Sequence, residues 1–120
     1  MSYVALATDR FEEVSHFYGE LLGIPIVEQW DRTNARGMRL DIGDMQLEIL
    51  DNAREYPRLE LGKTFNRVHI VVEVEDIDQA RESIKVDAPA IQDTSWGARL
   101  FLVHDPDGIS ITYLQWTGTQ

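Results

Sequence analysis

The feature that most constrains the fold of this chain is a repeat in its order of expected elements. A strand, an amphipathic helix and three further strand candidates occupy residues 3–50, and the same order returns over residues 68–116. The aspartates expected to open the two helices, Asp9 and Asp76, are 67 residues apart, and the last strands of the two halves align at an offset of 64 residues. The repeat predicts two βαβββ units.

The two helices are predicted from capping residues and apolar spacing. Asp9 can accept a hydrogen bond from a first-turn N–H, and Glu12 follows three residues later, as in a capping box. Apolar residues then recur at helical spacing: Phe11, Val14, Phe17, Tyr18, Leu21 and Leu22. Gly23 suits the position after the helix, and Pro25 prevents continuation. Asp76 is expected to open a second helix with fewer apolar residues.

Alternating apolar and polar residues predict the strands. They fall at residues 3–7, 24–30, 38–42, 45–49, 68–74, 90–92, 98–103 and 109–116. Between the halves, residues 51–66 are largely polar and contain Pro57 and Gly62, which is typical of a connector, expected at residues 53–65. We therefore expect a single α+β domain over residues 1–120, made of repeat 1 (1–52), the connector and repeat 2 (66–120).

The composition excludes several classes of function. The chain has 21 acidic and 11 basic residues and a net charge of −10, so nucleic acids and anionic membranes are disfavoured as partners. The absence of cysteine excludes a disulfide framework, a thiol nucleophile and an iron–sulfur cluster. Without a signal-peptide pattern or an apolar run of about 18 residues, we expect a cytoplasmic protein. The acidity favours solubility and would attract a cationic ligand.

Two segments, together with the repeat, carry a resemblance to a known family. The first is residues 9–23, with Phe17-Tyr18 and Leu21-Leu22-Gly23, and the second is residues 96–108, which end in Asp105-Pro106-Asp107-Gly108. The chain resembles the vicinal oxygen chelate superfamily, which includes glyoxalases, extradiol dioxygenases and the fosfomycin- and bleomycin-resistance proteins. The resemblance covers essentially the whole chain. It implies two βαβββ repeats that form curved mixed sheets around a concave cavity.

In the enzymes of that family, four inward side chains bind a divalent metal ion. The resemblance places these positions at Ser2, Glu48, His69 and Thr112. The hydroxyls of Ser2 and Thr112 are poor ligands for first-row divalent metals, so Glu48 and His69 remain only as remnants of a site. We expect no metal and no cofactor. The pair could line a pocket, act as an acid–base pair without metal, or keep a weak metal site.

The strand alternation also suggests which residues line the cavity. The candidate ligand-binding residues are Glu48, His69, Thr112, Arg39, Asp41, Phe101, Trp96 and Trp116. A few polar groups among aromatic walls are usual for a small-molecule site. Tryptophans can stack on a planar ligand and acidic groups favour a cation, although each tryptophan could equally serve the core or a dimer interface.

The bleomycin-resistance branch resembles this chain most, in Trp96-Gly97, in the incomplete metal set and in its acidity. Proteins of that branch bind a bulky cationic drug as dimers, without metal. The resemblance implies a metal-free, drug-sequestering kind of small-molecule-binding protein, connected with antibiotic resistance, that prefers aromatic cationic ligands and forms a homodimer. The alternative is a lyase, isomerase or dioxygenase with an atypical metal site. A third possibility is a regulatory or scaffold domain without a ligand.

Overall fold

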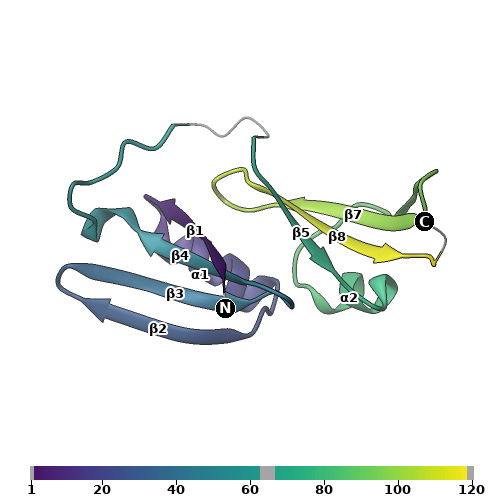
Figure 1. Ribbon diagram of the computed structural model, residues 1–120, viewed down its shortest axis with the longest axis horizontal. Coiled ribbons are helices and arrows are strands. Elements are labelled where there is room, and N and C mark those ends of the chain that lie inside the picture. Colours follow the sequence, from purple (N-terminus) through teal and green to yellow (C-terminus); the bar gives the residue numbers. More distant parts are fainter. Residues whose placement is uncertain (1, 63–66, 119–120) are drawn as a thin grey trace. The chain divides into compact units, whose positions relative to one another are not determined.

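The computed structural model describes residues 2–62 and 67–118 (Figure 1). The chain divides into two compact units, unit 1 up to residue 63 and unit 2 from residue 64. Each unit contains a four-stranded mixed sheet and one α-helix. The α+β fold with two repeats that the sequence predicts is confirmed.

Unit 1 has the order of elements that the sequence predicts. Its elements are β1 (Tyr3–Thr8), α1 (Phe11–His16), a π-helical turn η1 (Phe17–Leu21), β2 (Ile26–Arg32), β3 (Ala35–Asp41), β4 (Gln46–Asp51) and a 3₁₀ turn η2 (Asn52–Arg54). The strands lie in the order β1-β4-β3-β2. β1 runs parallel to β4, and the other neighbours are antiparallel. The strand β2 therefore forms one edge of this sheet.

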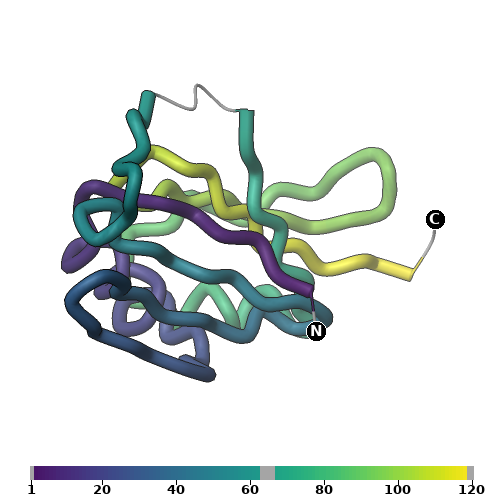
Figure 2. Tube along the Cα trace, turned by 60° about the vertical axis from the view of Figure 1, so that its left-hand side comes forward, coloured from purple at the N-terminus to yellow at the C-terminus, as the bar shows by residue number. Residues whose placement is uncertain are grey.

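Unit 2 repeats this topology with shorter outer elements. It contains β5 (His69–Glu73), α2 (Ile77–Ser83), β6 (Gln92–Asp93), β7 (Ala98–His104) and β8 (Ser110–Trp116). The strand order β5-β8-β7-β6 corresponds to that of unit 1, with β5 parallel to β8. The tube in Figure 2 allows both paths to be followed from strand to helix to hairpin.

Each sheet buries one face beneath its helix. In unit 1, Leu47 and Ile49 of β4 are at most 1% exposed and belong to the same core as Tyr18, which is fully buried. In unit 2, Ile77 of α2 and Ile111 of β8 are both fully buried. Burial of these apolar side chains is the main stabilising contribution in each unit. The opposite face of each sheet is the one available for a site.

The two helices begin differently, and one predicted cap is wrong. Asp76 is the N-cap of α2, and its carboxylate accepts from the Gln79 N–H at 3.1 Å, as predicted. The N-cap of α1 is Arg10, not Asp9, and no side chain caps that helix. The Asp9 carboxylate instead accepts from Nδ2 of the fully buried Asn52, an interaction between distant residues that local spacing does not reveal.

The strand register corrects one position carried over from the family. β1 pairs Tyr3 with Gln46, and β5 pairs His69 with Ser110. Gln46 and Ser110 are related by the same offset of 64 residues that aligns the last strands. Tyr3 therefore corresponds to His69, and the assignment of Ser2 is wrong by one residue, because α1 begins one residue later than the sequence predicts, with Arg10 and not Asp9 as its N-cap.

Candidate functional site

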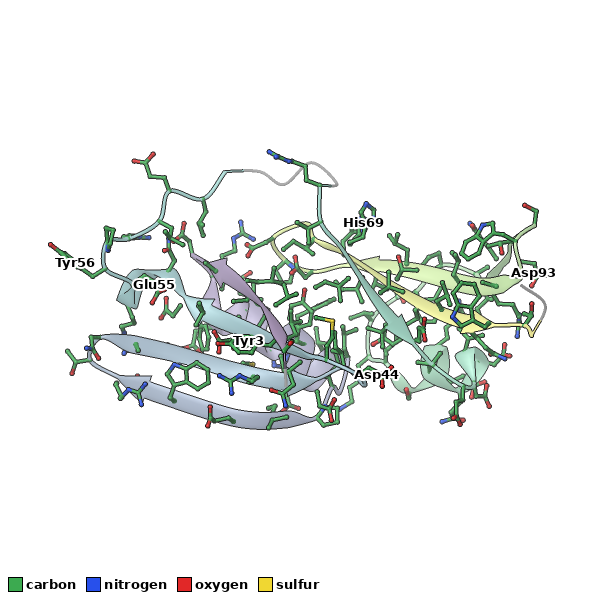
Figure 3. The ribbon with its side chains drawn as sticks, in the orientation of Figure 1. Tyr3, Asp44, Glu55, Tyr56, His69 and Asp93 are labelled. Carbon is green, nitrogen blue, oxygen red and sulfur yellow. The ribbon has the colours of Figure 1, made fainter. Side chains whose placement is uncertain are left out.

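The face of the unit 1 sheet away from α1 carries an arginine held between aromatic and acidic side chains. We call it the open face of unit 1; its central residues are Tyr3, Glu28, Trp30, Arg39 and Glu48. Arg39 Nη2 donates to Glu48 Oε2 at 2.9 Å, and its Nη1 lies 3.5 Å from Glu28 Oε1. The guanidinium carbon lies 4.6 Å from the ring centroid of Tyr3, which is labelled in Figure 3, and 5.7 Å from that of Trp30.

Because Glu48 is buried, its pairing with Arg39 decides how its charge is compensated. Glu48 is 7% exposed, so its carboxylate has little contact with water. The hydrogen bond to Glu48 is the main cause that raises the pKa of Arg39 above its ordinary value. Arg39 Nε is also buried and has no hydrogen-bond partner within the described residues. The charge of Glu48 is thus compensated inside unit 1 and is not free to attract a cationic ligand.

A glycine in the middle of β3 makes room for the indole ring of this cluster. Trp30 pairs with Gly37 across the β2–β3 ladder. A Cβ atom at Gly37 would lie 2.6 Å from Trp30 Cζ2 and 2.8 Å from the carbonyl oxygen of Ile49. The ring therefore lies across the backbone of β3, beside Arg39. The sequence contained a signal for this close approach, since a glycine inside a strand often marks one.

On unit 2, the face away from α2 carries two tryptophans and a carboxylate. Trp96 and Trp116 are 52% and 41% exposed, and their rings meet edge to face with centroids 5.7 Å apart. Trp116 Nε1 donates to Glu73 Oε1 at 3.0 Å. We call these three residues the tryptophan pair site. His69 and Thr112 lie on the same face by strand alternation, and His69 is exposed.

Phe101 does not lie on the face to which the sequence assigned it. Thr112 pairs with Leu102, whereas Phe101 pairs with Tyr113 on the side covered by α2. Phe101 is 1% exposed and stacks on Tyr113 with ring centroids 4.9 Å apart. The prediction that Phe101 shares a wall with Thr112 is therefore wrong, and Leu102 takes that place. Arg99 likewise faces α2, because its Nη1 lies 3.0 Å from Asp78.

The other predicted residues have varied surroundings. Asp41, at the end of β3, is exposed and accepts from the Gly43 N–H at 2.9 Å, which stabilises the turn into β4. Arg39 and Glu48 contact each other in unit 1, and Trp96 contacts Trp116 in unit 2. Alternation along the strand at residues 68–74 places Glu73 on the cavity side, but the sequence did not single out Tyr3, since nothing in a single strand shows which cross-strand neighbours its side chains meet.

The residues at the metal positions of the family do not form a suitable set of ligands. Those positions hold Tyr3 and Glu48 in unit 1, and His69 and Thr112 in unit 2. Catalytic metal sites normally use three strong protein ligands, whereas Glu48 is already bound to Arg39 and Thr112 offers a neutral hydroxyl. Within residues 2–62 and 67–118, no group of three or more His, Asp or Glu side chains could hold a metal ion.

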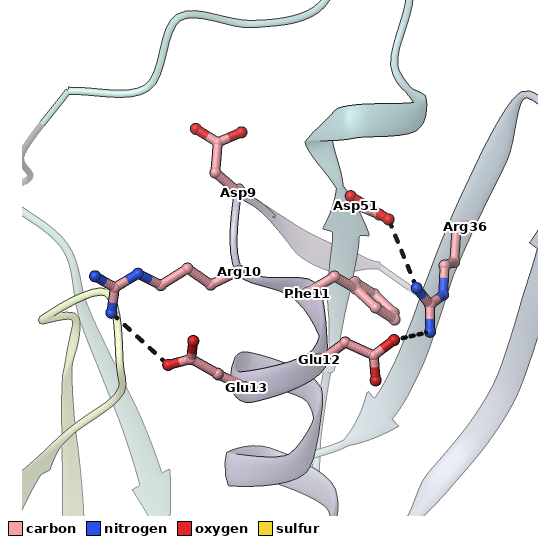
Figure 4. A pocket seen from close by; sticks show the side chains of 7 residues that line it. All are labelled: Asp9, Arg10, Phe11, Glu12, Glu13, Arg36 and Asp51. Carbon is pink, nitrogen blue, oxygen red and sulfur yellow. Dashed lines mark hydrogen bonds and ion pairs between the residues drawn. The ribbon is translucent and has the colours of Figure 1, made fainter.

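A hollow of about 320 Å³ lies beside the first turn of α1 (Figure 4). Arg36 dominates it: its Nη2 donates to Glu12 Oε1 at 2.6 Å, and its guanidinium carbon lies 4.6 Å from the Phe11 ring centroid. Its Nη1 is 3.9 Å from Asp51 of β4. The hydrogen bond to Glu12 is the main cause that raises the pKa of Arg36. These contacts fasten the helix to the sheet, so we assign the cluster a structural role.

Comparison with known proteins agrees with this architecture. Residues 1–113 match the Glyoxalase/Bleomycin resistance protein/Dioxygenase superfamily. The chain therefore belongs to that superfamily. No curated protein sequence matches it significantly. None of the helices in the described ranges is long and apolar enough to cross a membrane.

Solved structures of low sequence identity share the fold. A glyoxalase/bleomycin resistance protein/dioxygenase from Nocardioides has a TM-score of 0.72 and 18% identity, with 99% of this chain and 84% of that chain covered. A lactoylglutathione lyase from Agrobacterium tumefaciens has a TM-score of 0.66 and 16% identity, covering 96% and 92%. TnmS3, an antibiotic-binding protein from Streptomyces sp. CB03234, has a TM-score of 0.64 and 20% identity, covering 97% of each chain.

Proposed function

We propose that this protein binds a planar aromatic cation without a metal ion and without chemical conversion, at the tryptophan pair site of unit 2. The observation that carries the proposal is the half-exposed pair Trp96 and Trp116 with the Glu73 carboxylate beside it. Indole faces attract cations through their quadrupole, and indole is the strongest of the aromatic side chains in this respect. An adjacent carboxylate adds Coulombic attraction.

The charge preference in this proposal rests on Glu73 instead of Glu48. Glu48 is buried and paired with Arg39, so a ligand cation would have to compete with a guanidinium that is already in place. Glu73 is exposed, and Trp116, which donates a hydrogen bond to it, is neutral. Thr112 and His69 lie on the same face but farther along the strands from Trp116, and they are proposed as polar contacts for the distant end of a longer ligand. The antibiotic-binding neighbour TnmS3 supports a binding function, since it shares the fold.

We also infer that the two repeats and their connector (residues 1–52, 53–65 and 66–120) act as one domain. The family match supports this inference, because it extends across both units. The ligand site on unit 2 and the open face of unit 1, with Arg39, would then belong to the same domain.

The test compares two probes of nearly equal shape, N-methylacridinium and neutral acridine, at a pH well above the acridine pKa, by isothermal titration calorimetry on the full chain. Trp116→Leu is expected to weaken both probes by about tenfold, because it removes a ring face. Glu73→Gln is expected to weaken N-methylacridinium by about fivefold and to leave acridine unchanged, because only a Coulombic attraction is lost. The matched control is Glu28→Gln, an exposed carboxylate of unit 1.

Equal losses for the two probes in Glu73→Gln would contradict the charge preference. No loss in Trp116→Leu would contradict the location of the site. The metal-dependent alternative has its own outcome: tight Zn²⁺ or Mn²⁺ binding by the unaltered chain that disappears in Glu48→Ala would favour the enzyme. If the metal set is incomplete as we propose, Thr112→Glu should raise metal affinity, because it adds a strong ligand.

A further inference from the structure

The strand β2 is a long, exposed edge of the unit 1 sheet. It has seven residues and pairs with β3 on one side, while its other side has no strand partner in the described part of the chain. Figure 1 shows it as the outermost strand of its sheet. All its residues except Trp30 are exposed, including Ile26 at 41% and Val27 at 52%. Unpaired backbone groups on such an edge readily accept another strand.

The charges along β2 are complementary to a second copy of the same strand. Arg32 is exposed, and its guanidinium has no ion pair or hydrogen bond within the described residues. Arg32 lies two residues after Trp30, and Glu28 lies two residues before it. The side chain of Glu28 is 57% exposed, and its Oε1 lies 3.5 Å from Arg39 Nη1. Glu28 and Arg32 both point to the open face, because residues 28, 30 and 32 alternate with 29 and 31.

Symmetry leaves few registers for pairing two copies of β2. Paired residues in an antiparallel ladder share a face, so a twofold axis must pass through one residue that pairs with its own copy. An axis at Trp30 sets Glu28 opposite Arg32 twice. An axis at Asp31 sets two carboxylates opposite each other, and an axis at Gln29 forms no pair of opposite charges. Since opposite charges across strands stabilise and like charges destabilise, the register through Trp30 is favoured.

The space beside β2 is open to a partner. A hollow of about 330 Å³ follows the strand and is lined by Glu28, Gln29, Trp30, Arg32 and Arg39. The Trp30 ring lies across Gly37, toward β3, and so does not cover the free edge. At the hairpin end, Arg54 holds Asp31 at 2.9 Å and donates to the Arg32 carbonyl, which fixes the strand in its extended form.

We propose that a second copy of this chain adds to the free edge of β2, antiparallel and in register about Trp30. The pairing joins the four-stranded sheet of unit 1 in one copy to the same sheet in the other copy, so that the two form one continuous sheet. Backbone hydrogen bonds hold the two strands together, and the two Glu28–Arg32 pairs select the register. The surface of Ile26 and Val27 that is now exposed is partly covered. The inference stands independently of the ligand proposed for unit 2.

The experiment is sedimentation equilibrium of the full chain with charge reversals on β2. Arg32→Glu and Glu28→Arg each place like charges opposite each other twice, so each is expected to raise the dimer dissociation constant by about tenfold or more. The combined variant, Glu28→Arg with Arg32→Glu, restores opposite charges between the two copies and is expected to recover most of the loss; full recovery is not expected, because the new arginine also lies near Arg39 of its own chain. Lys85→Glu is the control, because Lys85 is exposed in unit 2 and the change in net charge is the same as in Arg32→Glu.

Three results would overturn the proposal. One is a monomer at concentrations of about 50 μM. Another is a dimer that Arg32→Glu weakens no more than Lys85→Glu does, which would place the interface elsewhere. The third is a combined variant whose dimer dissociates as readily as those of the single variants, which would contradict the register through Trp30. Circular dichroism of each variant verifies that the chain is folded, and Arg32→Glu removes no ion pair or side-chain hydrogen bond within the described residues.

Discussion

The two units share the contacts on their helix-covered faces. In unit 1, Arg36 of β3 bonds Glu12 in the first turn of α1 and lies 3.7 Å from Asp31 of β2. In unit 2, Arg99 of β7 bonds Asp78 in the first turn of α2 and lies 3.4 Å from Asp93 of β6. The same type of side chain thus fastens helix to hairpin twice. These contacts are repeated because each unit buries its helix against the corresponding face of its own sheet.

The open faces of the two units have diverged. Arg39 and Glu48 pair across β3 and β4, whereas the corresponding pair across β7 and β8 is Leu102 and Thr112. The position of Gly37, which lets Trp30 lie on β3, is occupied by Leu100 in unit 2. The comparison teaches that packing constrains the helix side in both repeats, while the open side is free to differ. It is on that side that specific binding can evolve.

The largest expected effect comes from replacing Arg39 of unit 1 by leucine, the residue at the corresponding position of unit 2, Leu102. Arg39→Leu leaves the largely buried Glu48 carboxylate without its guanidinium partner, so we expect it to lower the free energy of unfolding more than any of the variants that follow. Urea denaturation at pH 7 measures this loss. Adding Glu48→Thr completes the exchange and should recover most of the stability, because no charge is then buried. A double variant as unstable as the single one would show that the ion pair itself is required.

The second effect is steric. In Gly37→Ala the new methyl group would meet both Trp30 and the Ile49 carbonyl, so we expect a loss of about 2 kcal/mol in the free energy of unfolding. Gly62→Ala is the matched control: no atom lies within 4 Å of its added Cβ, and its cost should stay within about 0.5 kcal/mol. Equal stability of the two variants would show that the Trp30 ring does not lie on β3 in solution.

The third effect is a pH dependence of stability that arises in unit 2, from Tyr113. Burial raises the pKa of Tyr113 in unit 2 from 10.0 to about 12, so the unfolded chain loses this proton first. The corresponding stability is present below pH 10 and is lost as the pH rises toward 12. Between pH 8 and 11 we expect a loss of about 1.4 kcal/mol that Tyr113→Phe abolishes. Urea denaturation at pH 8 and pH 11 measures this loss of stability. The control is Tyr56→Phe, because Tyr56 is fully exposed. If Tyr113→Phe lost as much stability at high pH as the unaltered chain, the loss would belong to other groups.

The smallest effect concerns the helix caps. Asp76→Ala removes the side chain that accepts from the Gln79 N–H and should cost about 1 kcal/mol. Arg10→Ala changes the N-cap residue of α1, where no side chain caps the helix, and should cost less than about 0.5 kcal/mol. Thermal unfolding of the two variants gives the comparison. A larger loss at Arg10 would mean that α1 depends on its first turn more than α2 does.

The sequence predicted the fold well where polar and apolar residues alternate. Leu47 and Ile49 face the core and Glu48 the open side, as expected from their alternation. Along β7, residues 100–103 are all apolar, so alternation carried no information about its faces, and Phe101 was assigned to the wrong one. The contact of Arg39 with Glu48 depends on cross-strand register, which neighbouring residues in the sequence do not encode.

The edge-to-face geometry of Trp96 and Trp116 has a spectroscopic consequence. Two indoles with centroids 5.7 Å apart and planes inclined by 68° couple their electronic transitions, which produces a pair of circular dichroism bands of opposite sign. The remaining tryptophan, Trp30, lies in unit 1 and has no indole neighbour among the described ring contacts. The coupled bands therefore report on unit 2 alone. Compared with the peptide signal of the whole chain, they would reveal whether the two halves unfold together, without any added label.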